Sequence, residues 1–211
     1  MKKKFLVLCG VLAPVVYLVS VLVGGGMTPG YSPIRQPVSD LIASGAAHKA
    51  ALDPVFGVYN VLTLAFGFGL WQKARAGQQG RGKTAGIVGA LVLVAEGVFG
   101  LITLFFPEDA GGVGAEISST GMMHIVFAGL SSLTTMLSML LIGFWFRGRA
   151  DQRKLALYSF LSVGLVFVSG GLTAASIANA SPIGGLLERI TIGGFLQWMF
   201  VTAVALYRSK E

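Results

Sequence analysis

Six apolar stretches of the chain, separated by shorter polar segments, are long enough to be membrane-spanning helices. They cover approximately residues 5–23, 55–71, 85–106, 122–146, 155–178 and 186–207. A helix rises about 1.5 Å per residue, so a hydrocarbon core of about 30 Å requires about 20 apolar residues. The stretch 55–71 is short, but Tyr59 and Trp71 can hold its ends at the two interfaces. The pattern predicts an all-α integral membrane protein, a single domain over residues 1–211 built as a bundle of six transmembrane helices.

Local residues indicate where several of these helices begin. Asp53 followed by Pro54 is typical of an N-cap with a proline at the first helical position. Thr84 is a candidate cap for the third helix, and Ser118, Ser119 and Thr120 are candidate caps for the fourth. Within the long loop 24–53, the part at 37–44 predicts a short helix lying in the membrane interface.

Composition agrees with a protein whose surface faces lipid. Hydrophobic residues make up 54% of the chain and charged residues 12%, whereas an average soluble domain carries roughly a quarter charged residues. The net charge of +7 comes from short Lys and Arg clusters between the apolar stretches. Because these clusters form no continuous basic face, they report membrane topology, and we do not expect nucleic-acid binding.

The basic residues also predict an orientation in the membrane. Thirteen of the 16 Lys and Arg residues fall on the side that holds both termini, and Arg35, Lys49 and Arg189 fall on the other. Cytoplasmic loops keep the excess of Lys and Arg, so we expect a multi-pass protein of the cell membrane with both termini cytoplasmic and membrane lipids as its partners. The basic side comprises Lys2, Lys3, Lys4, Lys73, Arg75, Arg81, Lys83, Arg147, Arg149, Arg153, Lys154, Arg208 and Lys210, and the outer side also carries Asp40, Asp53, Glu108, Asp109, Glu116 and Glu188.

Glu96 is the acidic residue that lies deepest in an apolar stretch. It precedes Phe106 by ten positions, which places it near the middle of the bilayer. An acid there costs from about 2.5 kcal/mol upward on insertion scales, so it should face the bundle interior or be protonated. One interpretation is a proton or ligand site of a proton-coupled transporter. The other is a neutral carboxyl hydrogen-bonded to Gln197, Asn60 or a Ser or Thr of another span.

Asp109 and His124 are candidates for chemistry at the outer side, because the third and fourth stretches are joined by a short loop. A carboxylate and an imidazole in contact can act as a base and its orienting group. They can equally form a latch between two helix ends. Ser39 in the long outer loop would supply a nucleophile, which makes a membrane-embedded hydrolase or transferase the alternative function, although no nucleophile-elbow motif surrounds Ser39.

The first function hypothesis is a polar pocket on the outer side that binds a lipid headgroup or small amphiphile. Opposite charges converge there on an otherwise apolar bundle, from Arg35, Asp40, Asp109, His124 and Arg189. Two histidines and no Cys-x-x-Cys spacing exclude a three-histidine zinc site, and a haem held by two histidines between helices has no ligands. A mixed metal site of His124, Asp109 and Asp40 stays an alternative, but we expect neither a metal nor a cofactor. No motif specifies an oligomeric state.

Four short motifs lie in order along the chain, at 37–41 (Pro-Val-Ser-Asp-Leu), 106–109 (Phe-Pro-Glu-Asp), 123–124 (Met-His) and 187–190 (Leu-Glu-Arg-Ile). Together they resemble the bacterial and archaeal membrane family catalogued as domain of unknown function 998. The resemblance spans nearly the whole chain and implies a six-span bundle with no established activity, so it carries over no catalytic residue. A looser likeness to seven-span hydrolases such as alkaline ceramidases fails in the number of spans and of histidines.

Overall fold

The computed structural model describes residues 2–76, 82–110 and 117–209, and within these ranges it is helical without strands. Six long helices there are long and apolar enough to cross a membrane, which confirms the predicted six-helix membrane fold. Arg81, Glu116 and Lys210 of the charge count lie outside the described residues. The helices are α1 (Lys2–Met27), η1 (Ser39–Ile42), α2 (Lys49–Ala76), α3 (Lys83–Thr103), α4 (Ser119–Arg147), η2 (Ala150–Gln152), α5 (Arg153–Ala178) and α6 (Gly184–Arg208), where η denotes a 3-10 helix.

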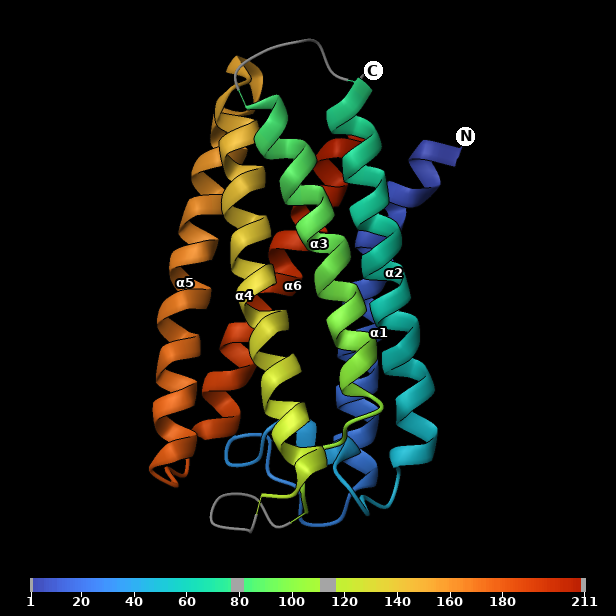
Figure 1. Ribbon diagram of the computed structural model, residues 1–211, viewed down its shortest axis with the longest axis vertical. Helices are drawn as coiled ribbons and strands as arrows, with labels where there is room; N and C mark the ends of the chain where they lie inside the picture. The colour runs from blue at the N-terminus through green and yellow to red at the C-terminus, as the bar shows by residue number, and fades with distance from the viewer. Residues whose placement is uncertain (1, 77–81, 111–116, 210–211) are drawn as a thin grey trace.

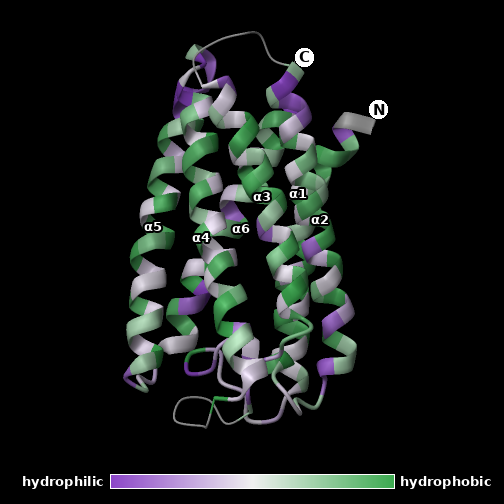
Figure 2. Ribbon diagram, viewed as in Figure 1, coloured by the Kyte–Doolittle hydropathy of each residue, from purple (hydrophilic) through white to green (hydrophobic). Residues whose placement is uncertain are grey.

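The six long helices close into a ring. Each packs against the next along the chain, and α1 also packs against α6. Figure 1 shows α2 to α5 as one row with α1 and α6 behind it, and both chain ends at the same end of the bundle. We call this the terminal end, and the opposite end, which carries η1 and the loops, the cap end. Figure 2 shows the helices mainly hydrophobic along their length, with hydrophilic residues gathered toward the two ends.

Two of the predicted helix starts are wrong. Helix α2 begins at Lys49, so Pro54 lies inside the helix and Asp53 is not its N-cap. Proline fits here because its fixed φ is helical and its missing N–H removes a single bond close to the helix end. Asp53 instead pairs with Lys49 one turn earlier, with 2.5 Å between Nζ and Oδ2. The long loop is consequently shorter than the sequence indicated.

Helix α3 is capped by Gly82 and not by the exposed Thr84. Gly82 has a φ of 92°, in the left-handed region, and a Cβ there would lie 2.8 Å from the carbonyl oxygen of Phe144. Both conditions favour glycine over a hydroxyl residue. Of the three candidate caps of α4, Ser118 is the one found, because its side chain accepts a hydrogen bond from the Gly121 N–H at 3.1 Å.

The interior of the terminal half is filled by large apolar side chains that are almost completely buried. Helices approach closely at glycine, since a Cβ on Gly86 would lie 2.5 Å from the Trp145 ring. The indole Nε1 of Trp198 donates to Ser159 Oγ at 2.9 Å, so the largest of these side chains is also satisfied. We call this set the apolar plug: Phe66, Leu70, Met139, Ile142, Phe146, Trp198, Met199 and Leu206.

Candidate functional site

The cap end is covered by a loop, residues 28–48, that is fastened to the N-terminus of α6. The Leu186 N–H donates to the Ile34 carbonyl at 2.9 Å, and the Gly185 N–H donates to the Arg35 carbonyl at 3.3 Å. The first N–H groups of a helix have no partner within it, so the loop carbonyls satisfy them. A Cβ on Gly185 would lie 2.2 Å from the Gln36 carbonyl oxygen, so only glycine allows this approach.

Side chains of α6 complete the attachment. Glu188 Oε2 accepts from the Val38 N–H at 2.6 Å. Arg189 donates through Nη1 to the Gln36 carbonyl at 2.8 Å and through Nη2 to the hydroxyl of Tyr31. We call Tyr31, Glu188 and Arg189 the cap clasp. Arg189, expected to contact a ligand, is thus placed where it holds the loop.

Tyr31 contributes to the clasp as both donor and acceptor. Its hydroxyl accepts from Arg189 and donates to the Pro37 carbonyl at 2.7 Å. Burial raises the pKa of Tyr31 above its ordinary value, and the neighbouring Arg189 opposes this effect. The phenol therefore stays protonated at neutral pH and keeps its donor role.

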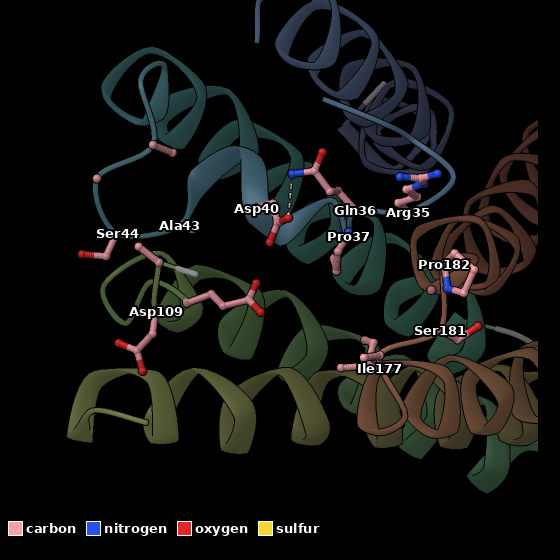
Figure 3. Close-up of a pocket in the computed structure, with 16 residues that line it drawn as sticks. Arg35, Gln36, Pro37, Asp40, Ala43, Ser44, Asp109, Ile177, Ser181 and Pro182 are labelled. Carbon is pink, nitrogen blue, oxygen red and sulfur yellow. Dashed lines mark hydrogen bonds between the residues drawn. The ribbon is translucent and has the colours of Figure 1, made fainter. Parts of the chain in front are cut away.

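A pocket of about 770 Å³ lies between the cap loop, the segment after α3 and the turn between α5 and α6. Figure 3 shows that the lining residues Arg35, Asp109 and Pro182 belong to these three parts of the chain. The Ser44 N–H donates to the Glu108 carbonyl at 2.8 Å, which ties the loop to the segment after α3. The lining comprises Arg35, Gln36, Pro37, Asp40, Ala43, Ser44, Gly45, Ala46, Glu108, Asp109, Ala110, Ile177, Ala180, Ser181, Pro182 and Gly184.

Two lining carboxyls have shifted pKa values. Burial raises the pKa of Asp40, against the opposing effects of the Gln36 amide, which donates to Oδ2 at 3.2 Å, and of Arg189. The Ser118 hydroxyl and then the Ser118 N–H, at 2.6 and 2.8 Å, lower the pKa of Asp109. Asp109 is therefore ionised at neutral pH. With three carboxyl side chains and one guanidinium, the lining favours a ligand that carries a positive group.

The pocket brings together only part of the predicted set. Arg35, Asp40 and Asp109 line it, whereas Ser39, Glu96, His124 and Arg189 are not among its lining residues. The structure therefore has a polar pocket at the cap end, with a different composition from the one expected.

The predicted pair at the ends of α3 and α4 is arranged differently from either expectation. His124 Nδ1 is hydrogen-bonded to the Phe106 carbonyl at 2.8 Å, and Asp109 is bound by Ser118. Within the described part of the chain, no hydrogen bond or ion pair joins Asp109 to His124 or either of them to Ser39, which opens η1. A latch between α3 and α4 does exist, but its acceptor is the backbone.

Glu96 lies inside the bundle with only 4% of its surface exposed. Of the partners expected, a Ser of another span is the one found, because Ser131 Oγ donates to Glu96 Oε1 at 3.3 Å. Asn60 donates to its own helix, and Gln197 bonds to Tyr158 and Ser162. The second carboxyl oxygen, Oε2, is buried without a hydrogen-bond partner.

Several residues of the site were not nominated from the sequence. The backbone carbonyl of Gln36 and the hydroxyl of Tyr31 both accept hydrogen bonds from Arg189, which lies more than 150 positions away in the sequence. Glu108 belongs to the Phe-Pro-Glu-Asp motif at 106–109, and its position beside Asp109 was the only feature of the sequence that pointed to it. Contacts made by backbone N–H groups, as at Gly185, leave no side-chain pattern in the sequence.

Comparison with known proteins gives a family without an activity. The family described as protein of unknown function (DUF998) matches residues 11–205, a range that includes the cap loop, the clasp and the pocket. No curated protein matches the chain, and no solved structure does. The function therefore has to be argued from the site.

Proposed function

The chain belongs to the DUF998 family of proteins of unknown function, and from its own residues we propose that it binds the headgroup of a lipid or another small amphiphile in the cap pocket. The observation that supports this is the pocket itself, which has charged and apolar walls in an otherwise lipid-facing bundle. Its volume of about 770 Å³ lies in the range of small-molecule sites, about 300–1,000 Å³.

The proposed orientation places this pocket outside the cell. Basic residues outnumber acidic ones at the terminal end. Within the described ranges, Asp151 is the one acidic residue at this end. Cytoplasmic loops keep such an excess, and anionic lipids attract each basic residue by about 1 kcal/mol. The termini are then cytoplasmic and the cap is external. The described basic residues of the terminal end are Lys2, Lys3, Lys4, Lys73, Arg75, Lys83, Arg147, Arg149, Arg153, Lys154 and Arg208.

The lining residues favour a zwitterionic headgroup. The Arg35 guanidinium suits a phosphate group, while Asp40, Glu108 and Asp109 suit an amine. Ile177 forms part of the wall, at the end of the lipid-facing helix α5. An acyl chain can therefore extend from the pocket into the membrane while the headgroup stays among the charges.

Titration of the purified protein with a short-chain zwitterionic phospholipid, and separately with an anionic phospholipid of the same chain length, tests this proposal. We expect tighter binding of the zwitterionic lipid. Arg35→Gln and Glu108→Gln should each weaken it about tenfold, which corresponds to a loss of about 1.4 kcal/mol. Lys49→Gln is the matched control, since Lys49 lies at the same end but pairs with Asp53 outside the lining. Equal affinities for all four proteins would overturn the proposal.

Among the described residues, no hydrogen bond or ion pair joins the three residues of the alternative hydrolase or transferase site. Catalysis by Ser39, His124 and Asp109 needs these side chains to act on one another. Asp109 and His124 are instead each hydrogen-bonded to other groups. We therefore propose a binding function and no reaction.

A further inference from the structure

Helices α4 and α5 are in close contact in the terminal half of the bundle. A Cβ on the buried Gly143 of α4 would lie 2.8 Å from the Phe160 ring and 3.1 Å from the Cβ of Ser159, both on α5. The rings of Phe144 and Phe160 also meet edge to face, with their centroids 5.2 Å apart. The bundle is therefore closed between α4 and α5 at this level.

The side of α4 that meets α5 is uncovered nearer the cap. With about 3.6 residues per turn, positions about 11 or 18 apart lie on the same side of a helix. Ile125 and Ser132 therefore continue the side of Gly143, and both are exposed. A Cβ on the exposed Gly129, which lies between them in the sequence, would have no described atom within 4 Å.

The side of α5 that meets α4 is uncovered in the same way. Gly164, Phe167 and Gly171 follow Phe160 along one side of the helix. Phe167 is 67% exposed. A Cβ on Gly164 or Gly171 would have no neighbour within 4 Å in the described part of the chain. The two helices therefore separate toward the cap, and Figure 1 shows their ribbons farther apart there than in the terminal half.

Each of the two helices keeps its other neighbour at this level. Ser131 of α4 donates to Glu96 of α3 at 3.3 Å, and Thr191 of α6 donates to Ser169 of α5 at 2.9 Å. The bundle thus opens between the α3–α4 pair and the α5–α6 pair. We call this opening the side groove. It is bordered by Ile125, Gly129 and Ser132 on α4 and by Gly164, Phe167 and Gly171 on α5.

The side groove leads to the cap pocket. One wall of the pocket is Glu108 and Asp109, and Asp109 is bound by Ser118, the N-cap of α4. Another wall is Ile177 near the end of α5, together with the turn 180–182. The pocket therefore lies between the same two helix pairs as the groove, at the cap end of the groove.

The depth and chemistry of the groove suit an acyl chain. From Gly164 to Ile177, α5 rises about 20 Å, which is more than half of a hydrocarbon core of about 30 Å. Helix α5 carries no charged residue from 155 to 178, and the side chains that border the groove are apolar apart from Ser132. The groove thus extends through the depth of one leaflet and faces the lipid chains of that leaflet.

We propose, on the basis of the headgroup site proposed above, that an acyl chain of the bound lipid lies in the side groove. The ligand then enters the pocket sideways from the membrane, and its chain stays between α4 and α5 while its headgroup is among the pocket charges. This arrangement makes the ligand a membrane phospholipid and excludes a small water-soluble molecule with the same headgroup as the full ligand.

Binding of two probes to the purified full chain in detergent micelles tests the proposal. One probe is a short-chain phosphatidylethanolamine, and the other is glycerophosphoethanolamine, which has the same headgroup without acyl chains. Gly129→Leu and Gly171→Leu each place a side chain in the open groove. We expect each to weaken phosphatidylethanolamine binding about tenfold, because excluding two methylene groups of the chain costs about that factor. Glycerophosphoethanolamine should bind both variants as it binds the native protein.

Gly26→Leu is the matched control. Gly26 lies on α1 near the cap end and is exposed, and a Cβ there would likewise have open space around it among the described residues. This variant should bind both probes with native affinity, because α1 does not border the side groove.

The outcomes separate the groove from the headgroup site. Native phosphatidylethanolamine affinity in both Gly129→Leu and Gly171→Leu would overturn the groove proposal and leave the headgroup site standing. An equal loss for both probes in these variants would also overturn it, because the substitutions would then act on the pocket. A native dimer that Gly171→Leu converts into a monomer would make a second copy of the chain the occupant of the groove. If neither probe binds the native protein, the headgroup site itself is rejected, and the chain site with it.

Discussion

The terminal and cap halves of the bundle are held together in different ways. In the terminal half, interdigitated apolar side chains fill the interior, and Trp198 is completely buried. At the cap end, the loop is held by directional hydrogen bonds from the N-terminus of α6 and from Arg189. Packing is tolerant of the chemistry of its members, whereas each polar contact requires a specific partner. Residues at the cap must therefore supply particular hydrogen-bonding groups, whereas residues in the terminal half must mainly fill space.

Helix α4 contains the same contrast within one element. Met139 and Ile142 in its terminal half are completely buried, while Met122 and Ile125 near the cap are 50% and 55% exposed. All four are apolar residues that the hydropathy pattern cannot distinguish. Exposure also varies within the terminal half, where Phe144 is 42% exposed, so hydropathy does not tell which face of α4 a residue occupies.

The largest effect should follow from truncating the plug. Trp198→Ala is expected to lower the free energy of unfolding by about 3–5 kcal/mol, because it removes a fully buried aromatic side chain and leaves a cavity. Phe200→Ala is the matched control, since Phe200 is 40% exposed on the same helix and should cost much less. Reversible unfolding in mixed micelles measures both. Equal losses would break the distinction between the plug and the lipid-facing surface.

Opening the clasp should have the next largest effect, and a local one. Arg189→Ala removes a charged donor to the Gln36 carbonyl and Tyr31, so we expect a loss of about 2 kcal/mol. Hydrogen exchange should accelerate at 34–38 and stay unchanged in the plug.

Arg35→Ala serves as the comparison for Arg189→Ala, because the exposed Arg35 side chain has no hydrogen bond in the described structure. It should leave exchange in the loop at the native rate. Exchange that accelerates equally in both variants, or throughout the bundle in Arg189→Ala, would show that the cap is not an independently held region.

A smaller effect is expected at the α4 cap that borders the pocket. Ser118→Ala removes the acceptor for the Gly121 N–H and one of the donors to Asp109, and the loss should be about 1 kcal/mol. Ser119→Ala is the control, because the exposed Ser119 follows the N-cap position. Thermal unfolding compares the pair, and equal melting temperatures would contradict the capping role of Ser118.

The smallest effect concerns pH and Asp40. Because burial raises the pKa of Asp40 in the folded protein, its ionisation opposes folding. The stability contributed by the protonated Asp40 carboxyl is fully present below its ordinary pKa of 3.8. This stability is lost as pH rises through the raised pKa of the folded state. Asp40→Asn should therefore be slightly more stable than the native protein above this window and show a shallower decline. Parallel melting curves from pH 3 to 7, a span chosen around the ordinary carboxyl range of about 4, would contradict it.

The fold was predictable to the level of the six spans because lipid exposure makes hydropathy a direct signal. Helix starts were less predictable. Pro54 indicated a helix start at residue 54, but α2 begins five residues earlier, at Lys49. Proline is compatible with several positions near a helix end, so it did not fix the start. Gly82, with no side chain to recognise, took the role expected of Thr84.

The site was predictable only in part, for a physical reason. Asp40, Asp109 and Arg35 stood out as charges on the outer loops, and the pocket contains them. Arg189 and His124 stood out equally, yet both are hydrogen-bonded to backbone carbonyls, at Gln36 and Phe106. A charge in a sequence does not reveal whether its partner is a ligand or the backbone, because every residue carries the same carbonyl.

The most direct test of the central claim is an experimental structure of the full chain in nanodiscs that contain a zwitterionic phospholipid. We predict density for a headgroup inside the pocket, with its phosphate at Arg35 and its amine among Asp40, Glu108 and Asp109, while Arg189 of the cap clasp stays hydrogen-bonded to the Gln36 carbonyl. A pocket that is filled by the cap loop, with headgroups ordered only around the rim of the bundle, would contradict it.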